Sequence, residues 1–233
     1  MITKYFVLTV FAGLLLGILA TGSAVSSTLL DEAEKLSWDT QNIGVLKALF
    51  PNRTSVETFL KEVDPVLEAA EARVGEYEIT NLGNDGKLEL LATIDVSGRG
   101  FTNSLLVVQK VNNTLEISKL SAPGIGIYNL KSCIVDLNND GVREVLLPRA
   151  LAVPKFGTDP RSFINDVYEW DKAGFHKANA SFKNYYRRLL PGLKAEHEAI
   201  VQGKKKLVDP SQKDLLRKKY EREIEEVNKI LNE

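Results

Sequence analysis

The stretch IVDLNNDGVREVL, residues 134–146, aligns without a gap onto ITNLGNDGKLELL, residues 79–91. In each copy an apolar run leads into an Asp-Gly turn pair, and a second apolar run follows the turn. Two copies of one pattern at a fixed offset indicate an internal repeat. The sequence therefore predicts one strand-loop-strand unit that occurs twice.

The zone around the repeat has the signals of further short strands. Alternating or continuous apolar runs occur at residues 88–94, 104–108 and 129–135, with turn-forming residues such as Asn112 and Asn113 between them. Runs of this length that are rich in β-branched residues and bounded by turn residues are typical of antiparallel strands. An antiparallel sheet is therefore expected in the middle of the chain.

Helical patterns flank this zone on both sides. Thr54 and Glu57 predict a capping box before a helical run, whereas Pro191 and Gly192 predict a break in a later helix. A terminal helix is expected to begin after Asp209. It carries one apolar stripe, made of Leu216, Tyr220, Ile224, Val227 and Leu231. Such a stripe must be buried against its own domain or against another chain.

The composition is that of a globular chain with balanced charge. Of the 233 residues, 44% are hydrophobic and 26% are charged, which allows one buried core. The chain has 30 basic and 31 acidic residues. Because nucleic-acid binding depends on lysines and arginines that neutralise phosphates, this balance argues against a nucleic-acid partner.

The first residues have the pattern of a secretory signal. Lys4 precedes an apolar run without charges at residues 5–20, and small residues follow at 22–24. As a helix the apolar run rises about 24 Å, less than the roughly 30 Å of a bilayer core. A cleaved signal is therefore favoured over an anchor, which predicts an extracytoplasmic protein, periplasmic or secreted, without a membrane span after cleavage.

The second copy of the repeat has the composition of a cation-binding loop. When Asp136 is counted as position 1, side-chain oxygens occupy positions 1, 3, 5 and 9, and Gly141 occupies position 6. Calcium loops use oxygen ligands in this order, with a backbone carbonyl at position 7 and a glycine for the sharp turn. The candidate calcium ligands are Asp136, Asn138, Asp140, Val142 through its carbonyl, and Glu144.

A plain β-hairpin is the competing interpretation, because Asp-Gly is a favoured turn pair. It explains Asp140 and Gly141 but gives no role to the other oxygen-bearing residues. An EF-hand is not expected, since position 12 is Leu147 instead of glutamate and the flanks read as strands. The first copy offers only two carboxylates, Asp85 and Glu89, so a second calcium site there is doubtful.

The second loop resembles that of a known family. Asp-x-Asn-x-Asp-Gly-x-x-Glu before an apolar strand is similar to the calcium loop of FG-GAP and VCBS repeats, the units of integrin-α-type β-propellers. The resemblance covers about residues 76–150 and implies a calcium-stabilised β unit in an extracellular or envelope protein with an interaction role. The repeat period leaves room for about two units, so a partial propeller is expected instead of a closed ring.

The expected fold class is α+β: a small antiparallel β region with the two strand-loop-strand repeats, in a partial propeller-like arrangement, between N-terminal and C-terminal helices. The expected boundaries are a signal peptide at 1–24, an N-terminal helical segment at 25–75, a β-rich repeat domain at 76–178 and a C-terminal helical segment at 179–233.

Two further features are interpreted as parts of the core. Cys133 lies in an apolar stretch, which favours a structural thiol over a nucleophile. Tyr168, Trp170 and Phe175 suit either an aromatic platform for a sugar or the packing face of a sheet, and the packing face is favoured.

Three functions remain open. The first is an exported non-enzymatic binding or structural protein with a calcium-stabilised β-loop and a protein or glycan partner. The second is a secreted hydrolase that uses a carboxylate pair, and the third is an adaptor that works through its C-terminal helix. The first is favoured, because the zinc-protease and P-loop patterns are incomplete and the chain has only two histidines, His176 and His197. A monomer is expected.

Overall fold

The computed structural model describes residues 27–95, 104–121, 127, 129–151, 160–171, 174–207 and 209–233. The predicted signal peptide lies outside these residues. Among the residues that are described, no helix is long and apolar enough to cross a membrane.

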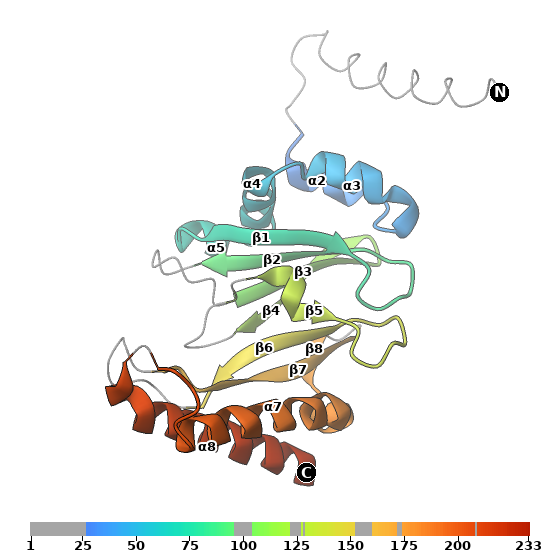
Figure 1. Ribbon diagram of the computed structural model, residues 1–233. Helices are drawn as coiled ribbons and strands as arrows, with labels where there is room; N and C mark the ends of the chain where they lie inside the picture. Colours follow the sequence, from blue (N-terminus) through green and yellow to red (C-terminus); the bar gives the residue numbers. More distant parts are fainter. Residues whose placement is uncertain are drawn as a thin grey trace, which may run out of the picture.

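The described chain forms four layers: helices, a sheet, a second sheet, and helices again (Figure 1). Each sheet is an antiparallel meander in which strands that follow one another in sequence are neighbours. The first sheet contains β1 (Arg73–Thr80), β2 (Glu89–Asp95), β3 (Ser104–Val111) and β4 (Thr114–Ser121). The second sheet contains β5 (Ile134–Val135), β6 (Glu144–Ala150), β7 (Phe163–Asp171) and β8 (Gly174–Lys177). The predicted α+β class, with an antiparallel β region between terminal helices, is confirmed.

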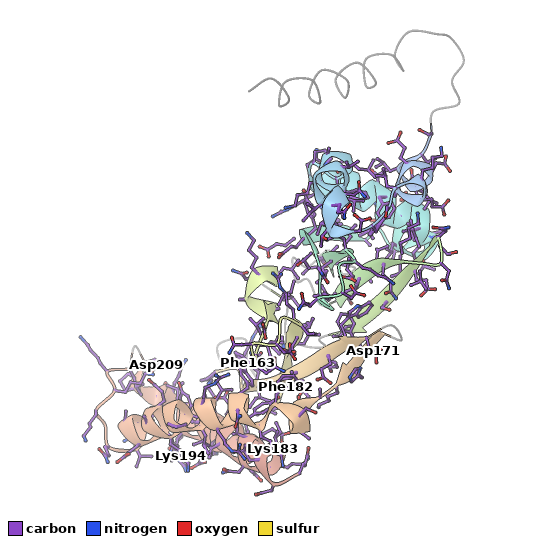
Figure 2. All side chains as sticks on the ribbon, turned by 90° about the vertical axis from the view of Figure 1, so that its right-hand side faces the viewer. Phe163, Asp171, Phe182, Lys183, Lys194 and Asp209 are labelled. Atoms are coloured by element: carbon purple, nitrogen blue, oxygen red, sulfur yellow. The ribbon has the colours of Figure 1, made fainter. Side chains whose placement is uncertain are left out.

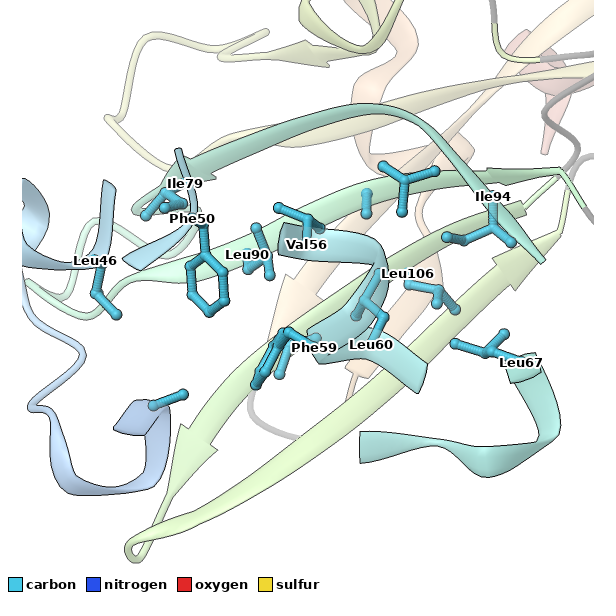
Figure 3. Packing of buried hydrophobic residues seen from close by; sticks show 14 of the residues in the cluster. Leu46, Phe50, Val56, Phe59, Leu60, Leu67, Ile79, Leu90, Ile94 and Leu106 are labelled. Carbon is cyan, nitrogen blue, oxygen red and sulfur yellow. The ribbon is translucent and has the colours of Figure 1, made fainter. Parts of the chain in front are cut away.

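The N-terminal helices cover the outer face of the first sheet. They are α2 (Leu29–Lys35), the 3-10 helix η1 (Thr40–Asn42), α3 (Ile43–Leu49), α4 (Arg53–Val63) and α5 (Pro65–Ala69). The rings of Phe50 and Phe59 pack at a tilt with centroids 4.8 Å apart, and Leu60 belongs to the same cluster as Leu90 and Leu106 of the sheet (Figure 3). Helix amphipathicity and strand alternation together therefore produce this first core.

The other face of the first sheet packs on the second sheet. Leu91, Leu105 and Val107 share a buried cluster with Val145 and Trp170. Because β2 and β3 are covered on both faces, their sequences are nearly continuous apolar runs instead of strict alternations.

The C-terminal helices cover the outer face of the second sheet. Residues from α7 (Lys183–Val201) and α8 (Lys213–Asn232) form a third core with β7, in which Tyr186, Val227 and Val167 are completely buried. The 3-10 helix η2 (Asn179–Phe182) leads into α7, and η3 (Pro210–Gln212) leads into α8. These helices lie at the opposite end of the molecule from α2–α4 (Figures 1 and 2).

Buried polar contacts also hold α8 on its own chain. Glu223 of α8 accepts the Phe163 N–H of β7 at 3.1 Å. Arg149 of β6 donates to Asp166 of β7 at 2.8 Å and to Glu226 of α8 at 2.7 Å. In the apolar stripe of the terminal helix, Val227 is completely buried and the other four residues are half-buried. The stripe therefore packs on the body of the same chain, which is the first of the two options its sequence allowed.

Three local expectations were wrong. Helix α4 is capped by Asn52 in a capping box with Ser55, because Glu57 instead accepts the backbone N–H of Val74 at 3.1 Å. Helix α7 continues through Pro191, since its packing on α8 and in the third core offsets the lost backbone hydrogen bond. The apolar run at 129–135 begins with the short helix α6 (Leu130–Cys133) and only then enters β5.

Candidate functional site

The two loops of the repeat adopt the same backbone conformation. Thr80 pairs with Glu89 at the end of the first hairpin, and Val135 pairs with Glu144 at the equivalent place in the second. The asparagine before each Asp-Gly pair and the glycine itself have positive φ in both copies: Asn84 52°, Gly86 82°, Asn139 61° and Gly141 88°. The sequence similarity of the two copies therefore corresponds to one loop structure that is built twice.

The aspartates of the second loop accept hydrogen bonds from the backbone of that loop. Asp136 Oδ1 accepts the Asp140 N–H at 3.2 Å, and its Oδ2 accepts the Gly141 N–H at 3.0 Å. Asp140 Oδ1 accepts a hydrogen bond from the Val142 N–H at 2.8 Å, and its Oδ2 accepts one from Nδ2 of the Asn138 side chain at 2.8 Å. These contacts hold the loop closed through its own side-chain oxygens and backbone N–H groups.

Glu144 lies below the loop and is 1% exposed. Its Oε2 accepts the Leu137 N–H at 2.8 Å. Burial raises the pKa of the Glu144 carboxyl, and the negative charges of Asp140 and Asp136 raise it further. The three carboxylates of the second loop therefore repel one another electrostatically.

The first loop repeats these contacts with fewer charges. Asn81 takes the place of the first aspartate and accepts the Asp85 N–H at 3.3 Å. Asp85 accepts the Lys87 N–H at 2.9 Å, and buried Glu89 accepts the Leu82 N–H at 2.9 Å. Each oxygen-bearing residue of the motif thus has a structural role in closing the loop, with or without a metal ion.

Burial raises the pKa of Glu89 to about 7, and the charge of Asp85 raises it as well. Lys87 acts in the opposite direction, because its positive charge lowers the pKa of Glu89. At the equivalent position the second loop has Val142. The first loop thus contains a cationic side chain that its counterpart lacks.

The two loops contact each other directly. The Arg143 N–H donates to the Leu82 carbonyl at 2.9 Å, and Arg143 Nη1 donates to Thr80 Oγ1 at 2.7 Å. A Cβ atom on Gly141 would lie 2.3 Å from Nδ2 of Asn84. The sequence did not predict the roles of Arg143 and Asn84 in this contact, because a contact between two loops that are far apart in the chain produces no local sequence pattern.

The candidate ligand atoms of the second loop are all oxygens, which suits a hard cation such as calcium. Within the described ranges, no group of three or more His, Cys, Asp or Glu side chains is assembled closely enough to hold a metal ion. In the second loop, Glu144 is directed at the Leu137 N–H, and both aspartates accept backbone donors of the loop. Because an ionised carboxylate has about four acceptor sites, these bonds leave lone pairs for an ion, and calcium binding would require the carboxylates to come closer together.

The two core interpretations made from the sequence agree with the structure. Trp170 is 7% exposed and packs edge-on against Phe175, with ring centroids 4.7 Å apart, and Tyr168 packs against the same cluster. Cys133 is partly buried beside them, and burial raises the pKa of its thiol. These residues serve the core between the sheets.

No family model matches the chain, and no curated protein or solved structure matches it either. The resemblance to FG-GAP and VCBS repeats therefore depends on the loop residues alone. The structural features that can be compared with it are two four-stranded meanders that pack face to face, in each of which the same kind of Asp-Gly loop joins the first two strands.

Proposed function

We propose that the chain is an exported, non-enzymatic binding or structural protein in which the loop at residues 136–144 holds a calcium ion that stabilises the β region. One observation carries this proposal: three carboxylates occupy one loop, and in the described part of the chain none of them forms an ion pair with a lysine or arginine. A divalent cation would neutralise their mutual repulsion.

The first loop supports this interpretation by contrast. It has fewer carboxylates, and the charge of Lys87 lowers the pKa of Glu89. The second loop has more carboxylates and an apolar Val142 at the position of that lysine. The proposed ligands are Asp136, Asn138, Asp140, the Val142 carbonyl and Glu144, and calcium there would supply the positive charge that the first loop obtains from its own side chain.

The location and partner are parts of the same proposal. The signal pattern at residues 1–24 supports export to the periplasm or the exterior. The FG-GAP and VCBS resemblance supports an interaction role with a protein or glycan partner. Burial of the terminal helix on its own chain supports a monomer.

The hydrolase alternative requires two carboxyl groups that act as acid and base. A groove of about 550 Å³ between β7, α7 and α8 contains Glu196 and Glu223. Both are already ion-paired, Glu196 with Lys205 and Glu223 with Lys219. These contacts favour a structural role for both carboxylates over an acid-base role.

Thermal melting in calcium, magnesium or chelator tests the calcium proposal. With a dissociation constant of about 0.1 mM, which is typical of extracellular modules, about 2 mM calcium would stabilise the protein by roughly 1.8 kcal/mol. For a domain of this size the melting temperature should rise by about 4 to 7 °C. Magnesium should have a smaller effect, because it gives up its water shell reluctantly.

Two matched substitutions distinguish the calcium-site interpretation of the loop from the plain β-hairpin interpretation. Asp140→Ala and Asp85→Ala each remove an aspartate that accepts the N–H two residues later, at 2.8 and 2.9 Å respectively. Both variants should therefore be destabilised in chelator, but only Asp140→Ala should abolish the calcium response. Melting curves of the parent protein that do not change with calcium would refute the metal site, and equal responses in the two variants would contradict its assignment to the second loop.

A further inference from the structure

A groove of about 430 Å³ lies between the N-terminal helices and the first sheet. The end of α2, the residues that follow it, the β1–β2 loop, and the end of β3 with its turn into β4 form its walls. Three lysines line it, namely Lys35, Lys87 and Lys110. The groove contains none of the proposed calcium ligands, so its chemistry can be considered separately.

Lys110 is held in a fixed position by the end of α2. Its Nζ donates to the backbone carbonyls of Glu34 and, at 2.8 Å, of Leu36. The carbonyl end of a helix is electronegative, which favours an ammonium group there. Because a lysine ammonium has three N–H donors, these two bonds leave one for a ligand in the groove.

The acids that line the groove are fewer than its lysines, although the charge of Lys87 also acts on Glu89 of the first loop. In the described part of the chain, no carboxylate lies within ion-pair distance of the three lysines. Asp39 is the acidic residue among those that line the groove. The three lysines and this aspartate give a formal lining charge of 3 − 1 = +2.

The carboxylate of Asp39 is occupied by neighbouring donors. It accepts hydrogen bonds from the Ser37 hydroxyl at 2.6 Å, from the Gln41 N–H at 3.0 Å, and from the Asn42 N–H and side-chain amide at 3.1 and 2.9 Å. These bonds, with that from Ser37 the strongest, lower the pKa of Asp39. The carboxylate is thus held in place as the cap of η1, it forms no ion pair with the three lysines, and its negative charge is the one subtracted in the lining charge.

Neutral side chains add hydrogen-bonding capacity at the edge of the groove. Asn112 and Asn113 form the β3–β4 turn with φ values of 49° and 66°, a left-handed conformation that asparagine tolerates, and both side chains are exposed. An amide can donate to a phosphate oxygen or accept from a ligand hydroxyl.

We propose that this groove is a binding site for a phosphate monoester. A phosphate monoester carries a charge of about −1.5 to −2 at neutral pH, which matches the net charge of the lining. Lys110 supplies the positioned donor, and Lys35 at the end of α2 and Lys87 of the β1–β2 loop supply the remaining positive charge. A carboxylate ligand has half the charge and matches the groove less well.

Calorimetric titration of the purified protein with glycerol 2-phosphate tests this site, and chelator in the buffer removes any contribution from calcium. Saturable binding is expected for glycerol 2-phosphate, none for glycerol, and clearly weaker binding for acetate. Lys87→Gln should weaken phosphate binding by about three- to five-fold, as expected for loss of one solvent-screened ion pair. Increasing the ionic strength should weaken it further, because exposed charges are screened.

Lys47→Gln is the matched control, since Lys47 is an exposed lysine on α3 that does not line the groove. It should bind glycerol 2-phosphate as the parent does. The absence of saturable binding would overturn the proposal, and so would an equal loss in Lys47→Gln and Lys87→Gln. Acetate that binds as tightly as the phosphate ester would contradict the assignment to a dianion. All of these outcomes are independent of the calcium response of the second loop.

Discussion

We expect Glu89→Gln to change the pH dependence of stability, with opposite effects at pH 5 and at pH 8. Glu89 is 4% exposed, and its pKa is raised from 4.5 to about 7 by burial and then by the charge of Asp85. The folded protein therefore keeps a proton that the unfolded chain releases as the pH rises above 4.5. The wild-type carboxyl should lower stability progressively from about pH 4.5 to pH 7, with no further loss above that range.

The magnitude follows from the size of the shift. Each pH unit between the two pKa values corresponds to about 1.4 kcal/mol, so the full change is about 3 kcal/mol. Glutamine removes this penalty and keeps an oxygen that can accept the Leu82 N–H, but it buries an additional amide that costs about 2 kcal/mol. The variant should be about 1 kcal/mol less stable than the parent at pH 5 and about 1 to 2 kcal/mol more stable at pH 8.

Urea denaturation at pH 5, 6, 7 and 8 in chelator measures these differences as free energies of unfolding. Glu116→Gln on β4 is the control, because Glu116 is exposed, and its stability should follow that of the parent at every pH. If Glu89→Gln retained the slope of the parent protein between pH 5 and 7, the reasoning from burial of this carboxyl would be refuted.

Two further predictions concern the contact between the loops and the burial of α8. Gly141→Ala and Gly86→Ala both place an alanine at positive φ, at a cost of about 1 to 2 kcal/mol. Only the new Cβ atom at position 141 also clashes with the Asn84 side chain. Chemical denaturation should therefore show that Gly141→Ala is more destabilising than Gly86→Ala by about 1 kcal/mol. Equal losses would mean that Asn84 moves aside without cost. Val227→Ala, at a completely buried position in α8, should lower the free energy of unfolding by about 2 kcal/mol, whereas Val66→Ala, 69% exposed, should change it by less than about 0.5 kcal/mol. Light scattering of the parent should give a monomer, and a dimer that disappears when α8 is deleted would contradict burial of the helix on its own chain.

The sequence was most informative where structure depends on neighbouring residues. In both copies of the repeat the aspartates bond to N–H groups a few residues away, and glycine takes up the positive φ, so the loop conformation is encoded locally. The apolar runs likewise predicted an antiparallel β region between helices, because sheets and helices must bury one face. The candidate ligands could be chosen from spacing alone for the same reason.

Local patterns failed where a distant partner competed with them. Glu57 suited a capping box, but it bonds to Val74 on β1, and Asn52 caps the helix instead. Pro191 suited a helix break, but both halves of α7 pack on the rest of the domain, and the helix continues. In each case a tertiary contact outweighed a local preference.

Only the tertiary structure decided how the two copies of the repeat meet and how their carboxyls behave. The bond from Arg143 to Leu82 joins residues that are far apart in the chain, and the pKa of Glu89 depends on the burial that packing creates. The lysines of the N-terminal groove come from a helix, a loop and a strand that converge only in the folded protein. The sequence by itself therefore determined the loops and the strands, because their hydrogen bonds and side-chain alternation are local. The fold determined the contacts, the charge balance and the grooves, because these depend on distances between separate segments.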